Sequence, residues 1–213
     1  MRSHHAQHCL QSENKDGRRP MSASASCLSL IGMPGSGKST LAAALADKTG
    51  WAYVDTDHLL EAWFGLPLED LRQSLDRQDF LQAEERTLLT LDLGRCIIAT
   101  GGSVIYCLQG MRALQRIGVI VSLQAEYACI EERVMQNPER GLVMKKGQTL
   151  GELYAERQAL YEHYADLTLR TDTCSLQDCV QTLETMLYEI RSTNKQYPED
   201  LSPSQRTLRQ DGV

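Results

Sequence analysis

Residues 32–40 read Gly-Met-Pro-Gly-Ser-Gly-Lys-Ser-Thr and decide the fold. They match the phosphate-loop pattern G-x-x-x-x-G-K-[ST], in which glycines let the backbone turn its N–H groups around a phosphate. An apolar run precedes them and a helical pattern follows, so the positive end of that helix adds to the same site. Lys38 can reach the β- and γ-phosphates, and the Ser39 hydroxyl can ligate Mg²⁺. The residues expected to bind ATP are Gly35, Ser36, Gly37, Lys38, Ser39 and Thr40.

Short β-prone runs alternate with helical patterns along the chain. The runs are Cys27–Ile31, Trp51–Val54, Cys96–Thr100, Val119–Leu123 and Leu167–Arg170. The helical patterns are Ser39–Lys48, His58–Phe64, Phe80–Leu93, Met111–Arg116, Tyr127–Gln136, Leu150–Tyr164 and Leu176–Ile190. The alternation predicts an α/β fold, in which a parallel sheet is covered by helices on both faces. Ligands are then expected at the carboxyl ends of the strands.

The composition and net charge of the chain indicate which kinds of partner and which cellular compartment to expect. The 213 residues carry a net charge of −6, with a pI of about 5.4, which argues against nucleic acid or an anionic membrane as the main partner. The apolar runs are too short to span a bilayer. Seven scattered cysteines without a C-x-x-C pair indicate a reduced, cytoplasmic chain. We also expect a monomer.

The two ends of the chain differ from its middle in composition. Residues 1–21 are polar and irregular, which predicts a disordered leader, and Met21 is a hypothetical true start. Residues 22–193 carry the alternating pattern and are expected to form one domain. Residues 194–213 are expected to be a disordered tail.

Two carboxylates, Asp55 and Asp57, end the second predicted strand. Strand alternation would point both to the same side, where they suit Mg²⁺ organisation and alignment of an acceptor hydroxyl. The alternative is a helix N-cap, because a helical pattern begins at His58.

Further polar groups follow the later strands. Gly101 and Gly102 either form a simple turn or let a ligand approach the backbone closely. Arg140 lies in a Gly- and Lys-bearing stretch that could close over the transferring phosphates, or could be an ordinary loop. Arg133 and Arg157 read as ordinary helix residues, although Arg157 could fork onto a carboxylate.

Taken together, these motifs resemble the shikimate kinase family of P-loop kinases. The resemblance covers about Cys27 to Arg191 and rests on the phosphate loop, D-T-D, G-G, a lid Arg and R-x-x-L-Y. It implies a five-stranded sheet in the order 2-3-1-4-5, a lid, and ATP with Mg²⁺ as cofactors. By position, Lys38, Asp57 and Arg140 would be catalytic. Asp55 would organise the metal water, Arg133 would lie beside the adenine, and Arg157 would bind the substrate carboxylate.

One position departs from the family pattern. The segment Phe80-Leu81-Gln82-Ala83-Glu84 has Leu81 where the family carries an Arg that helps to bind the shikimate carboxylate. The downstream Glu is retained as Glu84. Neighbouring Arg72, Arg77 or Arg86 are possible spatial substitutes. If nothing compensates, the loss of charge-assisted hydrogen bonds costs at least about tenfold in affinity for shikimate.

The predicted activity is therefore phosphoryl transfer from ATP to a hydroxyl of a small carboxylate metabolite. With Leu81 and Glu84 in the substrate pocket, we expect an amino acid alcohol such as homoserine, and the alternative is shikimate itself. A gluconate- or nucleotide-type kinase and a non-catalytic nucleotide-binding regulator are weaker alternatives. The sequence lacks the guanine-specifying N-K-x-D of GTPases.

Overall fold

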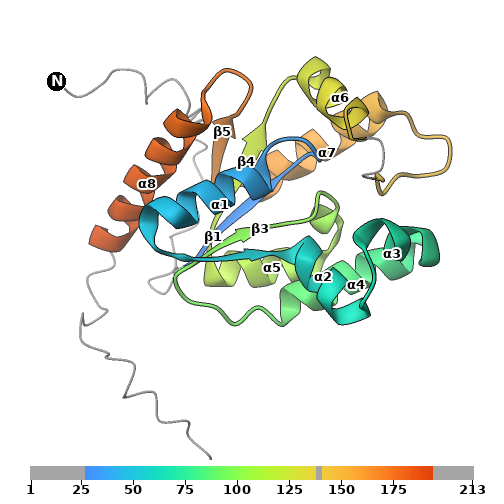
Figure 1. Cartoon of the computed structure of the whole chain (residues 1–213), viewed down its shortest axis with the longest axis horizontal. Coiled ribbons are helices and arrows are strands. Elements are labelled where there is room, and N and C mark those ends of the chain that lie inside the picture. The colour runs from blue at the N-terminus through green and yellow to red at the C-terminus, as the bar shows by residue number, and fades with distance from the viewer. Residues whose placement is uncertain (1–26, 138–140, 194–213) are drawn as a thin grey trace, which may run out of the picture.

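Five parallel strands form one sheet in the order β2-β3-β1-β4-β5, which confirms the predicted topology (Figure 1). A computed structural model of the chain describes residues 27–137 and 141–193. The strands are β1 (Cys27–Gly32), β2 (Ala52–Asp55), β3 (Cys96–Ala99), β4 (Gly118–Gln124) and β5 (Leu167–Arg170). The expected leader and tail and the expected lid residue Arg140 lie outside the described residues.

Helices connect the strands and follow the last one. They are α1 (Lys38–Thr49), α2 (Thr56–Phe64), α3 (Leu68–Ser74), α4 (Arg77–Leu89), α5 (Leu108–Ile117), α6 (Tyr127–Met135), α7 (Leu150–Tyr164) and α8 (Leu176–Thr193), with a 3₁₀ turn η2 (Val104–Tyr106). Within the described ranges, none of these helices is both long and apolar enough to cross a lipid bilayer.

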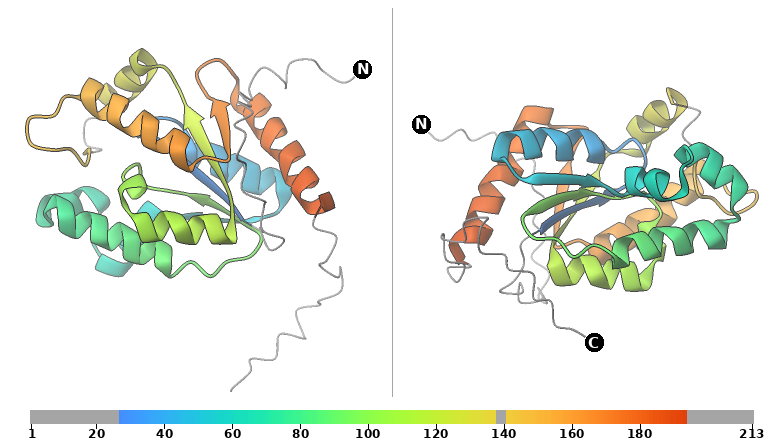
Figure 2. Two further views of the ribbon diagram at one scale, coloured as in Figure 1. Left: turned by 180° about the vertical axis from the view of Figure 1, so that it is seen from behind. Right: turned by 60° about the horizontal axis from the view of Figure 1, so that its bottom comes forward.

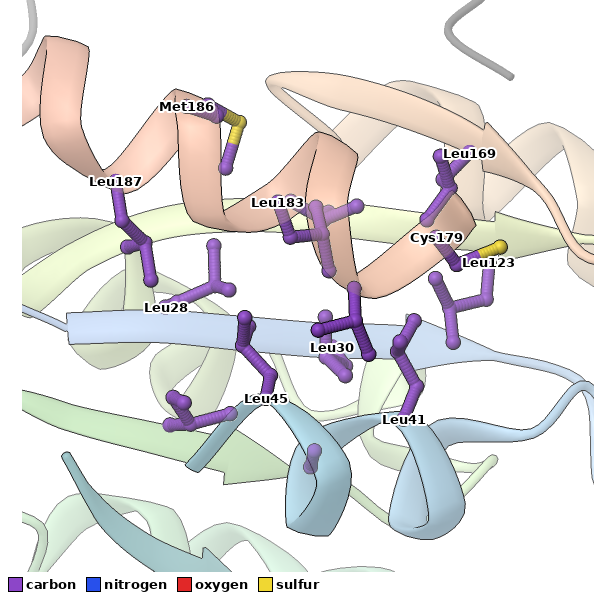
Figure 3. Packing of buried hydrophobic residues seen from close by; sticks show 14 of the residues in the cluster. Leu28, Leu30, Leu41, Leu45, Leu123, Leu169, Cys179, Leu183, Met186 and Leu187 are labelled. Carbon is purple, nitrogen blue, oxygen red and sulfur yellow. The ribbon is translucent and has the colours of Figure 1, made fainter. Parts of the chain in front are cut away.

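The sheet is apolar on both faces, as the continuous apolar runs predict. On β1, Leu28 and Leu30 pack against α1 and α8, whereas Cys27 and Ile31 belong to the core on the opposite face. Figure 3 shows the first of these cores between α8, β1 and α1, and Figure 2 shows the sheet from two further sides. Each fully buried leucine contributes about 1.5–3 kcal/mol. The central strand is therefore held from both sides, which fixes the loop that follows it.

A third apolar cluster joins α2, α3 and α4 beyond the end of β2. Its buried members are Leu60, Leu71, Phe80 and Ala83. Helix α3 was not among the predicted helices, because it has seven residues and only one of them, Leu71, is buried. It still positions the region after residue 140, since the Glu69 carboxylate accepts a hydrogen bond from the Gly141 N–H at 2.8 Å and the Arg72 guanidinium donates to the Gly141 carbonyl.

Helix α4 starts earlier and ends earlier than predicted. It begins at Arg77 rather than Phe80 because the Asp76 side chain caps it, accepting a hydrogen bond from the Asp79 N–H at 2.9 Å. It ends at Leu89 rather than Leu93. The earlier start matters for function, because it places Leu81 and Glu84 in the middle of a helix, with Arg77 one turn before Leu81.

Candidate active site

The phosphate loop joins β1 to α1 and leaves the first turn of that helix open. Gly35 and Gly37 have φ values of 83° and 92°, in the left-handed region that favours glycine. Gly37 is the N-cap residue of α1, and no side chain caps this helix end. The first N–H groups of α1 therefore point out of the loop without a side-chain acceptor, which is the geometry that binds a phosphate.

The Lys38 side chain folds back over this loop. Its Nζ donates hydrogen bonds to the carbonyl groups of Gly32 and Met33, both at 2.9 Å, and the residue is only 4% exposed. These two hydrogen bonds hold the ammonium group at the phosphate loop. The role of Lys38 in neutralising the phosphates stays a prediction.

A pocket of about 420 Å³ opens beside the loop. Arg133 crosses its wall, donating to the Gly35 carbonyl at 3.0 Å and to the Thr171 carbonyl at 3.4 Å. Thr171 in turn donates its hydroxyl to the Ser36 carbonyl at 3.0 Å. Arg133 is thus tied to the loop rather than solvated, and its predicted place beside the adenine is compatible with this position. The pocket is lined by Gly35, Ser36, Gly37, Thr40, Leu41, Arg133, Thr171, Cys174, Leu176 and Cys179.

Oxygen donors of Tyr53, Asp55 and Ser39 lie close together at the end of β2. The Tyr53 hydroxyl donates to the Asp55 carboxylate at 3.1 Å and also contacts the Ser39 side chain. Burial, followed by the charge of Asp55, raises the pKa of Tyr53 to about 12, so the phenol stays a donor. In the described part of the chain, no three His, Cys, Asp or Glu residues are placed so that they could hold a metal ion together. Mg²⁺ would therefore depend on Ser39, Asp55 and the triphosphate itself, and these hard oxygen donors suit it.

The strand-alternation argument for Asp55 and Asp57 was wrong in its geometry. The strand ends at Asp55, which is the N-cap of α2 and accepts a hydrogen bond from the Asp57 N–H at 3.0 Å. Asp57 is already helical and is 7% exposed. The N-cap alternative thus holds for Asp55, and the cap carries Asp57 into the acceptor side of the site.

Asp57 and Glu84 lie next to Gly101, on the expected acceptor side of the site. A Cβ on Gly101 would lie 2.3 Å from Glu84 Oε1 and 2.8 Å from Asp57 Oδ1, so only glycine fits between the two carboxyl groups. The Ser103 hydroxyl donates to Glu84 Oε2 at 2.6 Å, whereas Glu84 Oε1 is buried without a hydrogen-bond partner. Burial raises the pKa of Glu84 to about 7, the Ser103 hydrogen bond opposes the rise, and the Asp57 charge adds to it.

Gly102 brings the donor and acceptor sides together. A Cβ on Gly102 would lie 2.8 Å from Pro34 of the phosphate loop and 3.2 Å from Arg157 Nη1. The Gly102 carbonyl accepts a hydrogen bond from the Tyr161 hydroxyl at 2.7 Å, which anchors this turn to α7. Gly102 lies in a turn, and both glycines allow protein groups to approach the backbone closely, so close approach of a ligand stays a prediction.

Arg157 is a buried cation and not the surface residue that its helical setting suggests. It is 1% exposed, and its Nη2 donates to the Val143 carbonyl at 2.7 Å. Its guanidinium carbon lies 5.5 Å from the centre of the Tyr106 ring. Burying a cation is costly without an anion, so its position suits a ligand carboxylate.

Leu81 is half-buried on α4, between the turn of Arg77 and that of Glu84. Its main-chain oxygen accepts a hydrogen bond from the Cys107 thiol at 3.3 Å. Sequence reasoning missed three residues that contact the candidate site residues, namely Tyr53, Ser103 and Tyr106. Only Tyr53 had a local signal, since it lies two residues before Asp55 on the same strand. Ser103 and Tyr106 act through residues far away in the sequence.

Sequence comparison finds relatives of this chain among the shikimate kinases. The family model described as shikimate kinase matches residues 34–187. A shikimate kinase of Symbiobacterium thermophilum is 32% identical over 165 residues, covering 75% of this chain and 95% of that protein. One from Thermosynechococcus vestitus is 31% identical over 163 residues, covering 75% and 86% respectively.

Solved structures support the fold. A shikimate kinase from Acinetobacter baumannii, in complex with shikimate, superposes with a TM-score of 0.71 at 24% identity, covering 82% of this chain and 97% of that one. The enzyme from Bacteroides thetaiotaomicron gives a TM-score of 0.65 at 22% identity, covering 76% and 98%. With the phosphate loop, the buried acceptor carboxylates and the matched family model in agreement, this chain belongs to the shikimate kinase family of small-molecule phosphotransferases.

Proposed function

We propose that this protein transfers the γ-phosphoryl group of MgATP to a hydroxyl of a small carboxylate metabolite, and that shikimate is the first candidate acceptor. The contact of Gly102 with both Pro34 and Arg157 carries this proposal, because it places a buried cation beside the phosphate loop. The curated relatives named shikimate kinase support shikimate over the amino acid alcohol that Leu81 suggested.

The residues present suit an in-line transfer. Asp57 orients the acceptor hydroxyl, whose oxygen attacks the γ-phosphorus while the bond to the β-phosphate oxygen breaks and ADP leaves. Asp57 takes up the hydroxyl proton late in the reaction. Lys38 neutralises charge on the phosphates, and bound Mg²⁺ supplies further neutralisation beside Ser39 and Asp55. Arg133 holds the nucleotide side, and Arg140 is proposed to close over the phosphates.

Homoserine is kept as a second candidate because of one observation. Glu84 Oε1 is buried without a hydrogen-bond partner, and Leu81 leaves no guanidinium at the adjacent position of α4. An acceptor ammonium group would satisfy that oxygen, whereas shikimate carries no ammonium.

A panel of acceptors tests both candidates. ADP release is measured with shikimate, homoserine and gluconate, and the phosphorylated product is identified by mass spectrometry. Shikimate is expected to give the highest kcat/KM. A clear preference for homoserine would replace the first candidate by the second, and Glu84→Gln would then raise the KM for homoserine about tenfold. ATP binding without ADP release for any acceptor would leave a nucleotide-binding regulator.

We further propose a cytoplasmic monomer whose partners are small molecules, with residues 22–193 as the folded domain between a disordered leader and tail. The net charge of −6 supports small molecules as the partners, since nucleic acid or an anionic membrane would select a basic face. Size-exclusion chromatography with light scattering tests the monomer, and a mass near twice 23.9 kDa would refute it.

A further inference from the structure

Two guanidinium groups lie against one aromatic ring at the acceptor side of the site. The Arg77 guanidinium carbon is 5.0 Å from the centre of the Tyr106 ring, and that of Arg157 is 5.5 Å from the same centre. The three residues come from the start of α4, from η2 and from the middle of α7. The fold therefore gathers two cations from distant parts of the chain around one side chain.

Neither cation forms a salt bridge within the described residues, although the charge of Arg157 interacts with the buried Glu84 carboxyl. The Nε atom of both Arg77 and Arg157 is buried without a hydrogen-bond partner. The nearest acid on α7, Glu156, already accepts hydrogen bonds from the Tyr106 hydroxyl, Lys145 and Gln148. An anion that bound both guanidinium groups would use these donors and offset the repulsion between the two positive charges.

The position of Arg77 on α4 suits it to replace the arginine that the family carries at the position of Leu81. Long side chains on a helix lean toward its N-terminus and cover the preceding turn. A long cation at Leu81 would therefore lean toward the turn where Arg77 begins. Arg77 lies on that turn and contacts the Tyr106 ring.

We propose that Arg77 and Arg157 form a carboxylate clamp on the Tyr106 ring, in which Arg77 is a specificity-determining residue that supplies the cation absent at Leu81. The inference rests on the proposed function, because it requires an acceptor that carries a carboxylate. It holds for either candidate acceptor, since shikimate and homoserine both have this group. Arg77 binds the acceptor, while Lys38 and Asp57 perform the transfer.

The test pairs a variant of the protein with a change in the ligand. Steady-state rates are measured for wild type, Arg77→Gln and the control Arg86→Gln, using the best acceptor and its methyl ester. Arg86 lies on the same helix, and its side chain is exposed. Arg77→Gln should raise the KM for the free acid at least about tenfold, with kcat and the KM for ATP within about twofold. The ester should bind wild type poorly and lose nothing further in Arg77→Gln.

Several outcomes would overturn the clamp. They are an unchanged KM for the acid in Arg77→Gln, an equal loss for acid and ester, or the same loss in Arg86→Gln. Thermal melting checks that the variants fold. If Arg77→Gln does not fold, Arg77→Lys gives the same comparison with the charge kept, and its KM should rise less than tenfold. Adding Leu81→Arg to Arg77→Gln should restore affinity for the acid, which a purely structural role of Arg77 would not produce.

A binding measurement separates this inference from the proposed function. Calorimetric titration of the ADP-bound protein with shikimate and with homoserine needs no turnover. Binding that Arg77→Gln weakens about tenfold, without ADP release for any acceptor, would support the clamp and refute the kinase. Acceptor-dependent ADP release, with acceptor binding unchanged in Arg77→Gln, would support the kinase and refute the clamp. Absence of binding and of turnover would overturn both.

Discussion

Replacing Glu84 by Gln is expected to stabilise the folded protein at alkaline pH. Glu84 is 2% exposed and lies beside Asp57, so its ionised form is costly in the folded state. Gln keeps the shape of the side chain and still accepts the hydrogen bond from Ser103. The variant thus removes the ionisation and leaves the packing in place.

The magnitude follows from the raised pKa of Glu84. Its pKa rises from 4.5 to about 7, and each unit corresponds to about 1.4 kcal/mol, so the ionised form costs the folded state about 3 kcal/mol. Below the unfolded pKa the carboxyl is neutral in both states, and the cost is absent. As the pH rises from 4.5 to about 7, the unfolded chain releases the Glu84 proton before the folded chain does. The wild type therefore loses stability relative to Glu84→Gln. Above the folded pKa the difference becomes constant.

Urea unfolding of wild type and Glu84→Gln between about pH 5 and pH 8 measures this difference. The advantage of the variant should grow by about 2–3 kcal/mol over that range. Glu132→Gln is the matched control, because Glu132 is exposed on α6 and its replacement should change the stability by no more than about 0.5 kcal/mol. A stability difference between wild type and Glu84→Gln that does not change with pH would refute the reasoning.

Three further substitutions test the site and the sheet. Gly101→Ala should abolish acceptor-dependent ADP release and leave ADP binding intact, because its Cβ would lie 2.3 Å from Glu84 Oε1; turnover near wild type would contradict this. Gly118→Ala should lower the free energy of unfolding in urea by about 1–3 kcal/mol or more, since its Cβ would lie 2.0 Å from a main-chain oxygen of β1. The control Gly151→Ala on α7 should leave the stability unchanged or raise it. Arg133→Ala should raise the KM for ATP about tenfold with little change in kcat, and an unchanged KM would remove it from the nucleotide site.

The sheet could be predicted from the sequence because its signals are local. Each strand is a short apolar run, and the loop after β1 carries its own glycines, so position along the chain and position in space agree. The strand order came from the family resemblance. The errors also have local causes: α3 buries a single leucine, Leu71, and α4 starts at a cap, Asp76, that the apolar periodicity does not include.

The acceptor side was harder to predict because its contacts join distant residues. Ser103 meets Glu84 across 19 positions, and Tyr161 meets Gly102 across 59. Neither pair leaves a periodic pattern in the sequence. The fold brings such residues together, so their contacts could be found only from the structure.

Leu81 shows that a sequence motif does not by itself identify all the residues of a binding site. Compared position by position, the chain has lost a cation there, and that loss argued for a different acceptor. In the structure, Arg77 lies one turn earlier on the same helix and reaches the ring that Arg157 also contacts. A carboxylate is bound by the charge around it, whichever residue of the helix supplies that charge. We therefore expect the identity of the acceptor to depend on the combined charge of Arg77, Arg157 and Glu84, and not on Leu81 alone.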